Sequence, residues 1–224
     1  MKNKKKLRMW ENRMVRYAIF LYEYLILEKP RGLDFTMRDT RLFRYSKGKY
    51  HGYSKTDEKH LNTIFWTLDY SRSRKLLDVG CGKGVILKEA AGFPFEKISG
   101  IEIQPELVKT AEKNLKLLKL QDRAFCMRAD AETFDGYGDY NVFFFFNPFS
   151  EEVFQKVIAR ILQENRDKTE ELIFIYHNPQ FIDALEKGIR EEWAAGKHSS
   201  QISRSVLHDS RKDYDTVILR LRRE

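Results

Sequence analysis

The stretch from Lys75 to Gly84 constrains the fold of this chain more than any other. It reads Lys-Leu-Leu-Asp-Val-Gly-Cys-Gly-Lys-Gly. An apolar run that ends at turn residues predicts a strand buried on both faces, as in a parallel sheet. The glycines allow the backbone to turn tightly and to approach a ligand, and a helix that begins at Lys83 or Gly84 adds a partial positive charge. We therefore expect a ligand pocket at the carboxyl end of this strand.

The glycine spacing excludes two common phosphate-binding patterns. A dinucleotide fingerprint needs a glycine at position 85, where Val85 stands, and no Lys followed by Ser or Thr marks a phosphate loop here. The form Leu-Asp-Val-Gly-Cys-Gly-Lys-Gly instead resembles the first motif of class I S-adenosylmethionine (SAM) methyltransferases, in which an acid precedes the glycines and suits a ligand with an ammonium group. The resemblance implies that Asp78 serves the methionine end of SAM. It also implies that the surrounding turn is formed by Gly80, Cys81, Gly82 and Gly84. The alternative is a tight turn that only caps a helix.

Strands and helices are expected to alternate from residue 75 onward. Further strands are predicted at 97–103, 123–128, 140–146 and 172–176, with helices at 85–91, 105–120, 151–162 and 181–188. Two last strands, 200–207 and 216–221, read as a hairpin. This order predicts an α/β three-layer sandwich with a mostly parallel seven-strand sheet closed by a C-terminal antiparallel hairpin. We expect residues 71–224 to form the methyltransferase domain and residues 1–70 to form a basic N-terminal helical extension and lid.

Two more acids follow expected strands. Glu102 comes 24 residues after Asp78, close to the spacing of about 20 that is typical of ribose-binding acids in such folds, and a carboxylate can accept hydrogen bonds from both ribose hydroxyls. The resemblance implies that Glu102 and Ile103 hold the ribose and that Asp130 and Ala131 lie near the adenine. Alternatively, Glu102 is an ordinary polar strand end and Asp130 caps the turn that follows it.

The expected central strand ends in Asn147-Pro148-Phe149. Ligands of doubly wound sheets lie beyond the carboxyl ends of strands. The stretch resembles the Asn/Asp-Pro-Pro-Tyr/Phe motif of amino-group methyltransferases with one proline missing, and is similar to the Asn-Asn-Phe stretch of seven-strand histone-lysine methyltransferases. The resemblance implies that Asn147, Pro148 and Phe149 are catalytic, with the Asn oxygen and a backbone carbonyl accepting hydrogen bonds from the target amine. It also implies that Asn147 belongs to the cofactor-binding residues. The alternative is a turn that caps the next helix, with Phe149 in the core. His177, at the end of the next strand, could relay a proton or be only a polar boundary residue.

Positive charge is concentrated at the N-terminus. Residues 1–60 contain 16 Lys and Arg against 7 Asp and Glu, whereas the remainder contains 25 against 26, so the extension accounts for the whole net charge of +8. This indicates an anionic partner, most simply RNA or DNA; for Lys2 to Lys6 alone, a solubilising tail is the alternative. The segment 33–55 interleaves basic and aromatic residues: Arg38, Arg41, Arg44, Lys47 and Lys49 with Phe35, Phe43, Tyr45, Tyr50 and Tyr53. It suits stacked bases, or else forms a lid whose rings pack into the domain. The resemblance places Tyr53, just before a helix capped by Ser54 or Thr56, near the cofactor and the acceptor.

The remaining composition favours a cytoplasmic protein. A helix is expected over residues 7–28, but Glu23 interrupts its apolar run, no cleavage site follows, and the run is too short to span a bilayer. We expect this helix to pack on the domain, without membrane association. Cys81 and Cys126 fit free thiols of a reducing compartment, and neither has a second ligand at metal spacing, so no metal is expected.

These features together predict a SAM-dependent methyltransferase with S-adenosylhomocysteine (SAH) as product. The expected acceptor is an amino nitrogen of a nucleic acid. Two alternatives are a protein side-chain N-methyltransferase of the Lys or Gln type and a non-catalytic RNA-binding module of the same fold. The sequence carries no signal of the oligomeric state.

Overall fold

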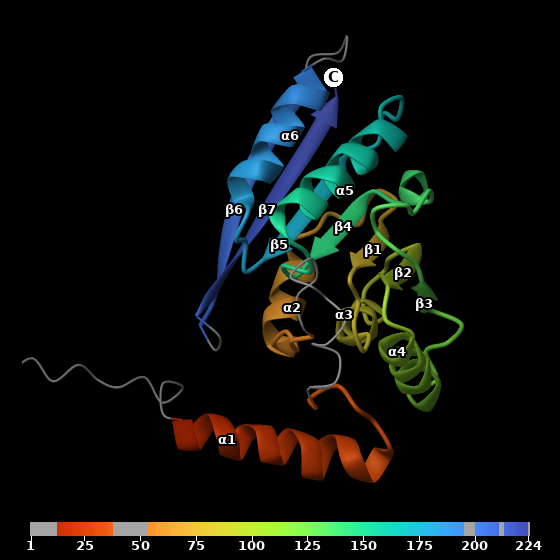
Figure 1. Ribbon diagram of the computed structural model, residues 1–224, viewed down its shortest axis with the longest axis vertical. Coiled ribbons are helices and arrows are strands. Elements are labelled where there is room, and N and C mark those ends of the chain that lie inside the picture. The colour runs from red at the N-terminus through yellow and green to blue at the C-terminus, as the bar shows by residue number, and fades with distance from the viewer. Residues whose placement is uncertain (1–12, 38–52, 195–199, 211–212, 224) are drawn as a thin grey trace, which may run out of the picture.

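The computed structural model describes residues 13–37, 53–194, 200–210 and 213–223 (Figure 1). Its helices are α1 (Arg13–Tyr22), the π-helix η2 (Glu23–Glu28), the 3-10 helices η3 (Lys29–Arg31) and η5 (Tyr137–Asp139), α2 (Glu58–Trp66), α3 (Val85–Ala90), α4 (Pro105–Leu117), α5 (Glu151–Glu164) and α6 (Ile182–Ala194). Its strands are β1 (Lys75–Val79), β2 (Lys97–Glu102), β3 (Phe125–Arg128), β4 (Val142–Phe145), β5 (Leu172–His177), β6 (Ser200–Asp209) and β7 (Tyr214–Arg223).

The strands form one seven-stranded sheet in the order β3-β2-β1-β4-β5-β7-β6. The pairs from β3 to β5 are parallel, whereas β7 runs antiparallel to both β5 and β6. The predicted α/β sheet with a closing antiparallel hairpin is therefore confirmed. Because β1 and β4 are neighbours at the centre, their carboxyl ends meet at one edge of the sheet.

Helices cover both faces of the sheet, because successive side chains of the central strands point to opposite sides. Phe143 and Phe145 of β4 pack in a cluster with α5 and α6. Val142 and Phe144 pack in a second cluster with residues of α2, α3 and α4. This explains why β4 reads as an unbroken apolar run, and it confirms the expected three layers.

Several apolar residues between Leu33 and Leu68 belong to the second of these clusters. Leu61 and Ile64 of α2 are fully buried there, and Phe35 is 2% exposed. The N-cap of α2 is Asp57, whose Oδ1 accepts a hydrogen bond from the backbone N–H of His60 at 3.1 Å. The expected caps Ser54 and Thr56 are therefore wrong, because the helix begins later than predicted.

The prediction that the N-terminal helix packs on the domain is wrong for most of α1 and η2. Met14 is 80% exposed, Tyr17 61% and Ile26 59%, and Glu28 is the buried residue of η2. Figure 1 shows α1 as a separate rod beyond the end of the molecule toward which the β4 arrow points. Amphipathic spacing predicted helical structure correctly for residues 13–28, and positions 7–12 of the prediction lie outside the described residues. The spacing does not show what the apolar side chains contact. None of the helices described is both long and apolar enough to cross a bilayer.

Both cysteines are free, as expected. Cys81 is buried, and its Sγ lies 3.3 Å from the Sγ of the half-buried Cys126 in β3. The Cys81 side chain rests on Gly100 of β2, where an added Cβ would stand 2.5 Å from the Cys81 Cβ. The turn after β1 is therefore packed directly onto β2.

Candidate active site

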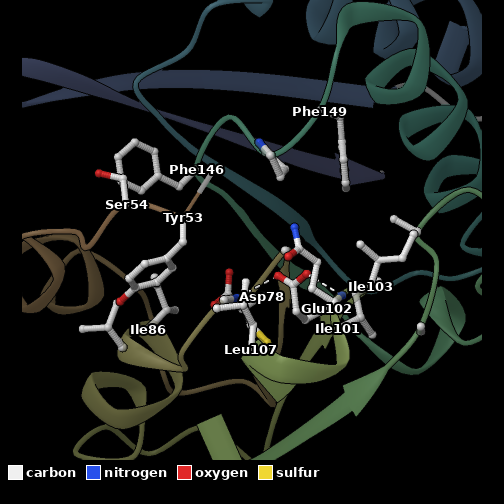
Figure 2. A pocket seen from close by; sticks show the side chains of 18 residues that line it. Tyr53, Ser54, Asp78, Ile86, Ile101, Glu102, Ile103, Leu107, Phe146 and Phe149 are labelled. Atoms are coloured by element: carbon white, nitrogen blue, oxygen red, sulfur yellow. Dashed lines mark hydrogen bonds between the residues drawn. The ribbon is translucent and has the colours of Figure 1, made fainter. Parts of the chain in front are cut away.

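A pocket opens at the carboxyl ends of β1, β2 and β4 (Figure 2). Three glycines of the turn after β1 have positive φ angles, +85° for Gly80, +53° for Gly82 and +82° for Gly84, which L side chains adopt with strain. The structure brings most of the sequence-predicted site residues to this pocket. They are Tyr53, Asp78, Gly80, Cys81, Gly82, Glu102, Ile103, Ala131, Pro148 and Phe149.

Two buried carboxylates lie side by side in the pocket, Asp78 from β1 and Glu102 from β2 (Figure 2). Glu102 accepts hydrogen bonds from the backbone N–H groups of Gly82 (3.1 Å) and Gln104 (2.9 Å). Asp78 Oδ2 is buried and has no hydrogen-bond partner among the described residues. Burial raises the pKa of both carboxyl groups, and the nearby Glu102 charge raises the pKa of Asp78 further. No Lys or Arg side chain of the described chain lines the pocket, which therefore favours a cationic ligand over a phosphate.

The turn after β4 forms another wall of the pocket. A Cβ added to Gly80 would stand 2.7 Å from the Cβ of Pro148, so the Asn147-Pro148 turn packs directly on the glycine turn. Asn147 has a φ of +46°, an uncommon conformation that the Asn side chain tolerates and that is often found at functional sites. Its Oδ1 accepts a hydrogen bond from the hydroxyl of Tyr176 on β5 at 3.2 Å.

Tyr53, which precedes α2 in the chain, forms a further wall of the pocket. A Cβ added to Gly82 would stand 2.3 Å from Tyr53 Cδ2, so the ring lies directly on the turn. The Tyr53 hydroxyl donates to the carbonyl of Phe35 at 2.5 Å, and burial raises the pKa of this hydroxyl well above its ordinary value. Of the segment 33–55, the structure describes residues 33–37 and 53–55, and among these Tyr53 and Ser54 line the pocket. The basic and aromatic residues from Arg38 to Tyr50 lie outside the described residues.

Four predicted site residues do not line the pocket: Gly84, Asp130, Asn147 and His177. The Asp130 carboxylate accepts from the backbone N–H of Glu132 at 2.9 Å, as the alternative of a turn cap expects. His177 is fully buried, with its Nδ1 2.8 Å from Thr216 Oγ1. Phe149 is 5% exposed and belongs to the core cluster under α5 while it also lines the pocket.

Sequence reasoning missed several lining residues because they lie in no motif. Phe146, the last residue before Asn147, and Gln104 and Leu107 at the start of α4 all face the pocket. It also missed Tyr176, which holds the Asn147 amide. The position of Gln104 just after an expected ribose-binding acid was a signal that the start of α4 lines the pocket. Tyr176 offers no such signal in an apolar strand.

Clusters of three or more His, Cys, Asp or Glu side chains that could hold a metal ion do not occur in the part of the chain that the structure describes. The expected absence of a metal stays a prediction.

A family model described as a methyltransferase domain matches residues 71–220, which is more than half of the chain. The chain belongs to this methyltransferase domain family. The predicted class I SAM-dependent methyltransferase, its enzymatic class and its cofactor are thereby confirmed. The matched range contains the glycine turn, both pocket carboxylates and the turn after β4.

The methyltransferase is similar to two curated proteins over short stretches. It is 36% identical over 58 residues to the rRNA N(6)-adenosine-methyltransferase metl-5 of Caenorhabditis elegans, which covers 25% of this chain and 27% of that protein. It is 38% identical over 64 residues to the ribosomal protein L11 methyltransferase of Trichlorobacter lovleyi, covering 28% and 21%. The chain thus matches only about a quarter of the length of each.

Among solved structures, the fold is similar to that of magnesium protoporphyrin IX methyltransferase from Synechocystis with bound SAM. The TM-score is 0.53 at 14% identity, covering 83% of this chain and 92% of that one. This likeness concerns the fold alone.

The pocket of the methyltransferase fits SAM. Asp78 offers a buried carboxylate oxygen that lacks a partner within the described residues, and a positive ligand would offset the cost of burying two acids there. Asp78 with the glycine turn would hold the methionine part, and Glu102 would hold the ribose. When bound, SAM supplies an activated methyl group.

Proposed function

We propose that this methyltransferase transfers the methyl group of SAM to an amino nitrogen of a nucleic acid, with Asn147 and Pro148 orienting the acceptor. The observation that carries the proposal is the packing of Pro148 on Gly80 at the pocket. This packing brings the turn that resembles an amino-group methyltransferase motif next to the turn that resembles a SAM-binding motif.

The surroundings of this turn suit a planar acceptor. The rings of Phe146 and Phe149 line the pocket beside Pro148 (Figure 2), and aromatic side chains stack on nucleobases. An aromatic amino group is unprotonated at neutral pH, so it needs no base to reach the site in reactive form. The protein's task is then to point the nitrogen lone pair at the methyl group and to exclude water.

Tyr176 supports a role of Asn147 as acceptor-orienting residue. The Tyr176 hydroxyl donates to Asn147 Oδ1 and accepts from the backbone N–H of Phe181 at 3.4 Å. These two contacts fix the direction of the Asn147 amide. A carbonyl oxygen has two lone pairs, so this contact is compatible with Oδ1 also accepting a hydrogen bond from the target amine.

The choice of a nucleic acid rests on two further observations. The short match to the rRNA N(6)-adenosine-methyltransferase favours an amino group of a base. The excess positive charge of residues 1–60 favours a polyanion as partner. We propose that the N-terminal extension docks the nucleic acid and that residues 71–224 carry the chemistry.

The test offers tritiated SAM to three acceptor pools: RNA transcribed in vitro, DNA amplified in vitro, and purified ribosomal proteins. We expect label in a nucleic-acid pool, recovered after digestion as an N-methylated nucleoside. Asn147→Ala should lower turnover roughly 100-fold, the scale of removing one transition-state hydrogen bond, while SAH affinity stays within about twofold because Asn147 does not line the pocket.

Asn178→Ala is a matched control for this substitution. Asn178 also precedes a proline, also follows a parallel strand, and has a φ of +51°. The proline after it, Pro179, does not line the pocket, whereas Pro148 after Asn147 does. We expect it to keep full turnover. If both variants lose turnover equally, the effect of Asn147→Ala reflects general strain, and the proposed role of Asn147 is wrong.

A protein acceptor is the second candidate, favoured by the short match to the ribosomal protein L11 methyltransferase. Label confined to the ribosomal proteins would establish it and overturn the nucleic-acid proposal.

A further inference from the structure

A buried cation joins the N-terminal segment to the glycine turn. Lys83 is 3% exposed, and its Nζ donates to Asp34 Oδ1 at 2.6 Å and to the carbonyl of Met37 at 2.7 Å. Burying an ammonium group without partners is costly. The turn between Gly82 and Gly84 therefore depends on residues 34–37 being in place.

Asn114 of α4 ties the same two segments together through their backbones. It is fully buried. Its Oδ1 accepts from the backbone N–H of Asp34 at 3.0 Å, and its Nδ2 donates to the carbonyls of Asp34 (2.9 Å) and Lys83 (3.1 Å). One side chain thus sets the position of Asp34 relative to Lys83.

The buried carboxylate of Glu28 shapes the rest of the segment. It accepts from the backbone N–H groups of Phe35 and Thr36, both at 2.9 Å, from the Thr36 hydroxyl, and from Lys55 Nζ at 3.3 Å. The backbone carbonyl of Phe35 in turn accepts a hydrogen bond from the hydroxyl of Tyr53. Contacts therefore run without a gap from Glu28 through Phe35 to the ring that lies on Gly82.

We propose that Asp34, Lys83 and Asn114 form a latch that holds Tyr53 on the glycine turn and makes its ring a wall of the methionine end of the cofactor site. Tyr53 lines the pocket beside Asp78 (Figure 2). The three latch residues are positioning residues, because they act through Tyr53 and the turn. This inference concerns the cofactor site and does not depend on which acceptor is methylated.

The experiment compares two ligands that differ only at the methionine end. SAH carries the amino acid chain, whereas 5′-methylthioadenosine lacks it. Calorimetric titration of Asp34→Asn, which removes the charge but keeps the backbone bonds to Asn114, should show SAH binding roughly tenfold weaker than wild type. Tyr53→Phe, which keeps the ring and loses the bond to Phe35, should weaken SAH roughly fivefold. Binding of 5′-methylthioadenosine should stay within about twofold in both variants.

Asp139→Asn is the matched control, because it breaks an exposed ion pair with Lys97 (3.1 Å) outside the cofactor pocket. It should bind both ligands as the wild type does. Unchanged SAH affinity in Asp34→Asn and Tyr53→Phe would overturn the latch, and so would an equal weakening of both ligands, which indicates general damage to the pocket. Failure of the acceptor proposal would appear in the labelling assay and would leave these affinities unchanged.

Discussion

Replacing Gly82 by alanine tests the packing of the cofactor turn directly. The φ of +53° places residue 82 in the left-handed region, where an L side chain costs about 1–2 kcal/mol. The new Cβ would stand 2.3 Å from the Tyr53 ring, so the ring must withdraw to reach an ordinary contact of 3.4 Å or more. Withdrawal breaks the hydrogen bond from Tyr53 to Phe35, which contributes about 1 kcal/mol. We expect Gly82→Ala to lower the free energy of unfolding by about 2–3 kcal/mol.

Urea unfolding at neutral pH measures this loss, and a second background separates its two parts. In Tyr53→Ala the collision is absent, so Gly82→Ala should cost only the backbone part, about 1–2 kcal/mol. Gly92→Ala is the control, because its Cβ would lie 3.5 Å from the nearest atom, with no positive φ, and it should change stability by less than about 0.5 kcal/mol. The reasoning is refuted if Gly82→Ala costs the same with and without Tyr53, or no more than Gly92→Ala.

Three further substitutions probe buried charge. Burial and the nearby Glu102 raise the pKa of Asp78. An acid whose pKa is raised in the folded protein loses its stabilising contribution as pH rises above its unfolded pKa of about 4. Asp78→Asn should therefore raise the unfolding temperature of the ligand-free protein at pH 7 but not near pH 3, and it should weaken SAH binding. Burial lowers the pKa of His60, so the contribution of His60 to stability is present above about pH 6.5 and is lost as pH falls. The free energy of unfolding should therefore decline less between pH 7 and pH 5 in His60→Gln than in the wild type. An unchanged slope would contradict this. Arg74→Met leaves buried Glu171, 2.6 Å away, without its most buried partner and should cost about 3 kcal/mol in urea unfolding, against less than about 0.5 kcal/mol for the exposed Lys156→Met.

Local patterns were sufficient to predict the sheet and the cofactor turn. The apolar run of β4, the amphipathic spacing of α4 and the glycines after β1 each follow from contacts between residues near in sequence, and all three elements occur where expected. The alternation of strands and helices then leaves few possible topologies, which is why the position of Glu102 beside Asp78 was predictable.

Contacts between distant, pattern-free residues were not predictable. Lys83 reads as one more exposed lysine, yet its partner Asp34 lies 49 residues away, and Asn114 bonds a segment 80 residues before it. The cap of α2 was misassigned because Ser54, Thr56 and Asp57 are all good caps and tertiary packing decides among them. The position of α1 was mispredicted because an apolar face does not identify its partner.

The π-helix η2 has a consequence for length changes in this chain. The backbone N–H of Lys29 bonds the carbonyl of Tyr24, five residues back, where an α-helix would reach four. Deleting one residue from 23 to 27 would restore α-helical spacing and rotate α1 by about 100° about its axis, while Glu28 would keep its bonds to Phe35 and Thr36. A single extra residue therefore sets the direction in which the exposed apolar side chains of α1 face, so an insertion or deletion here would redirect that surface more than any substitution in it.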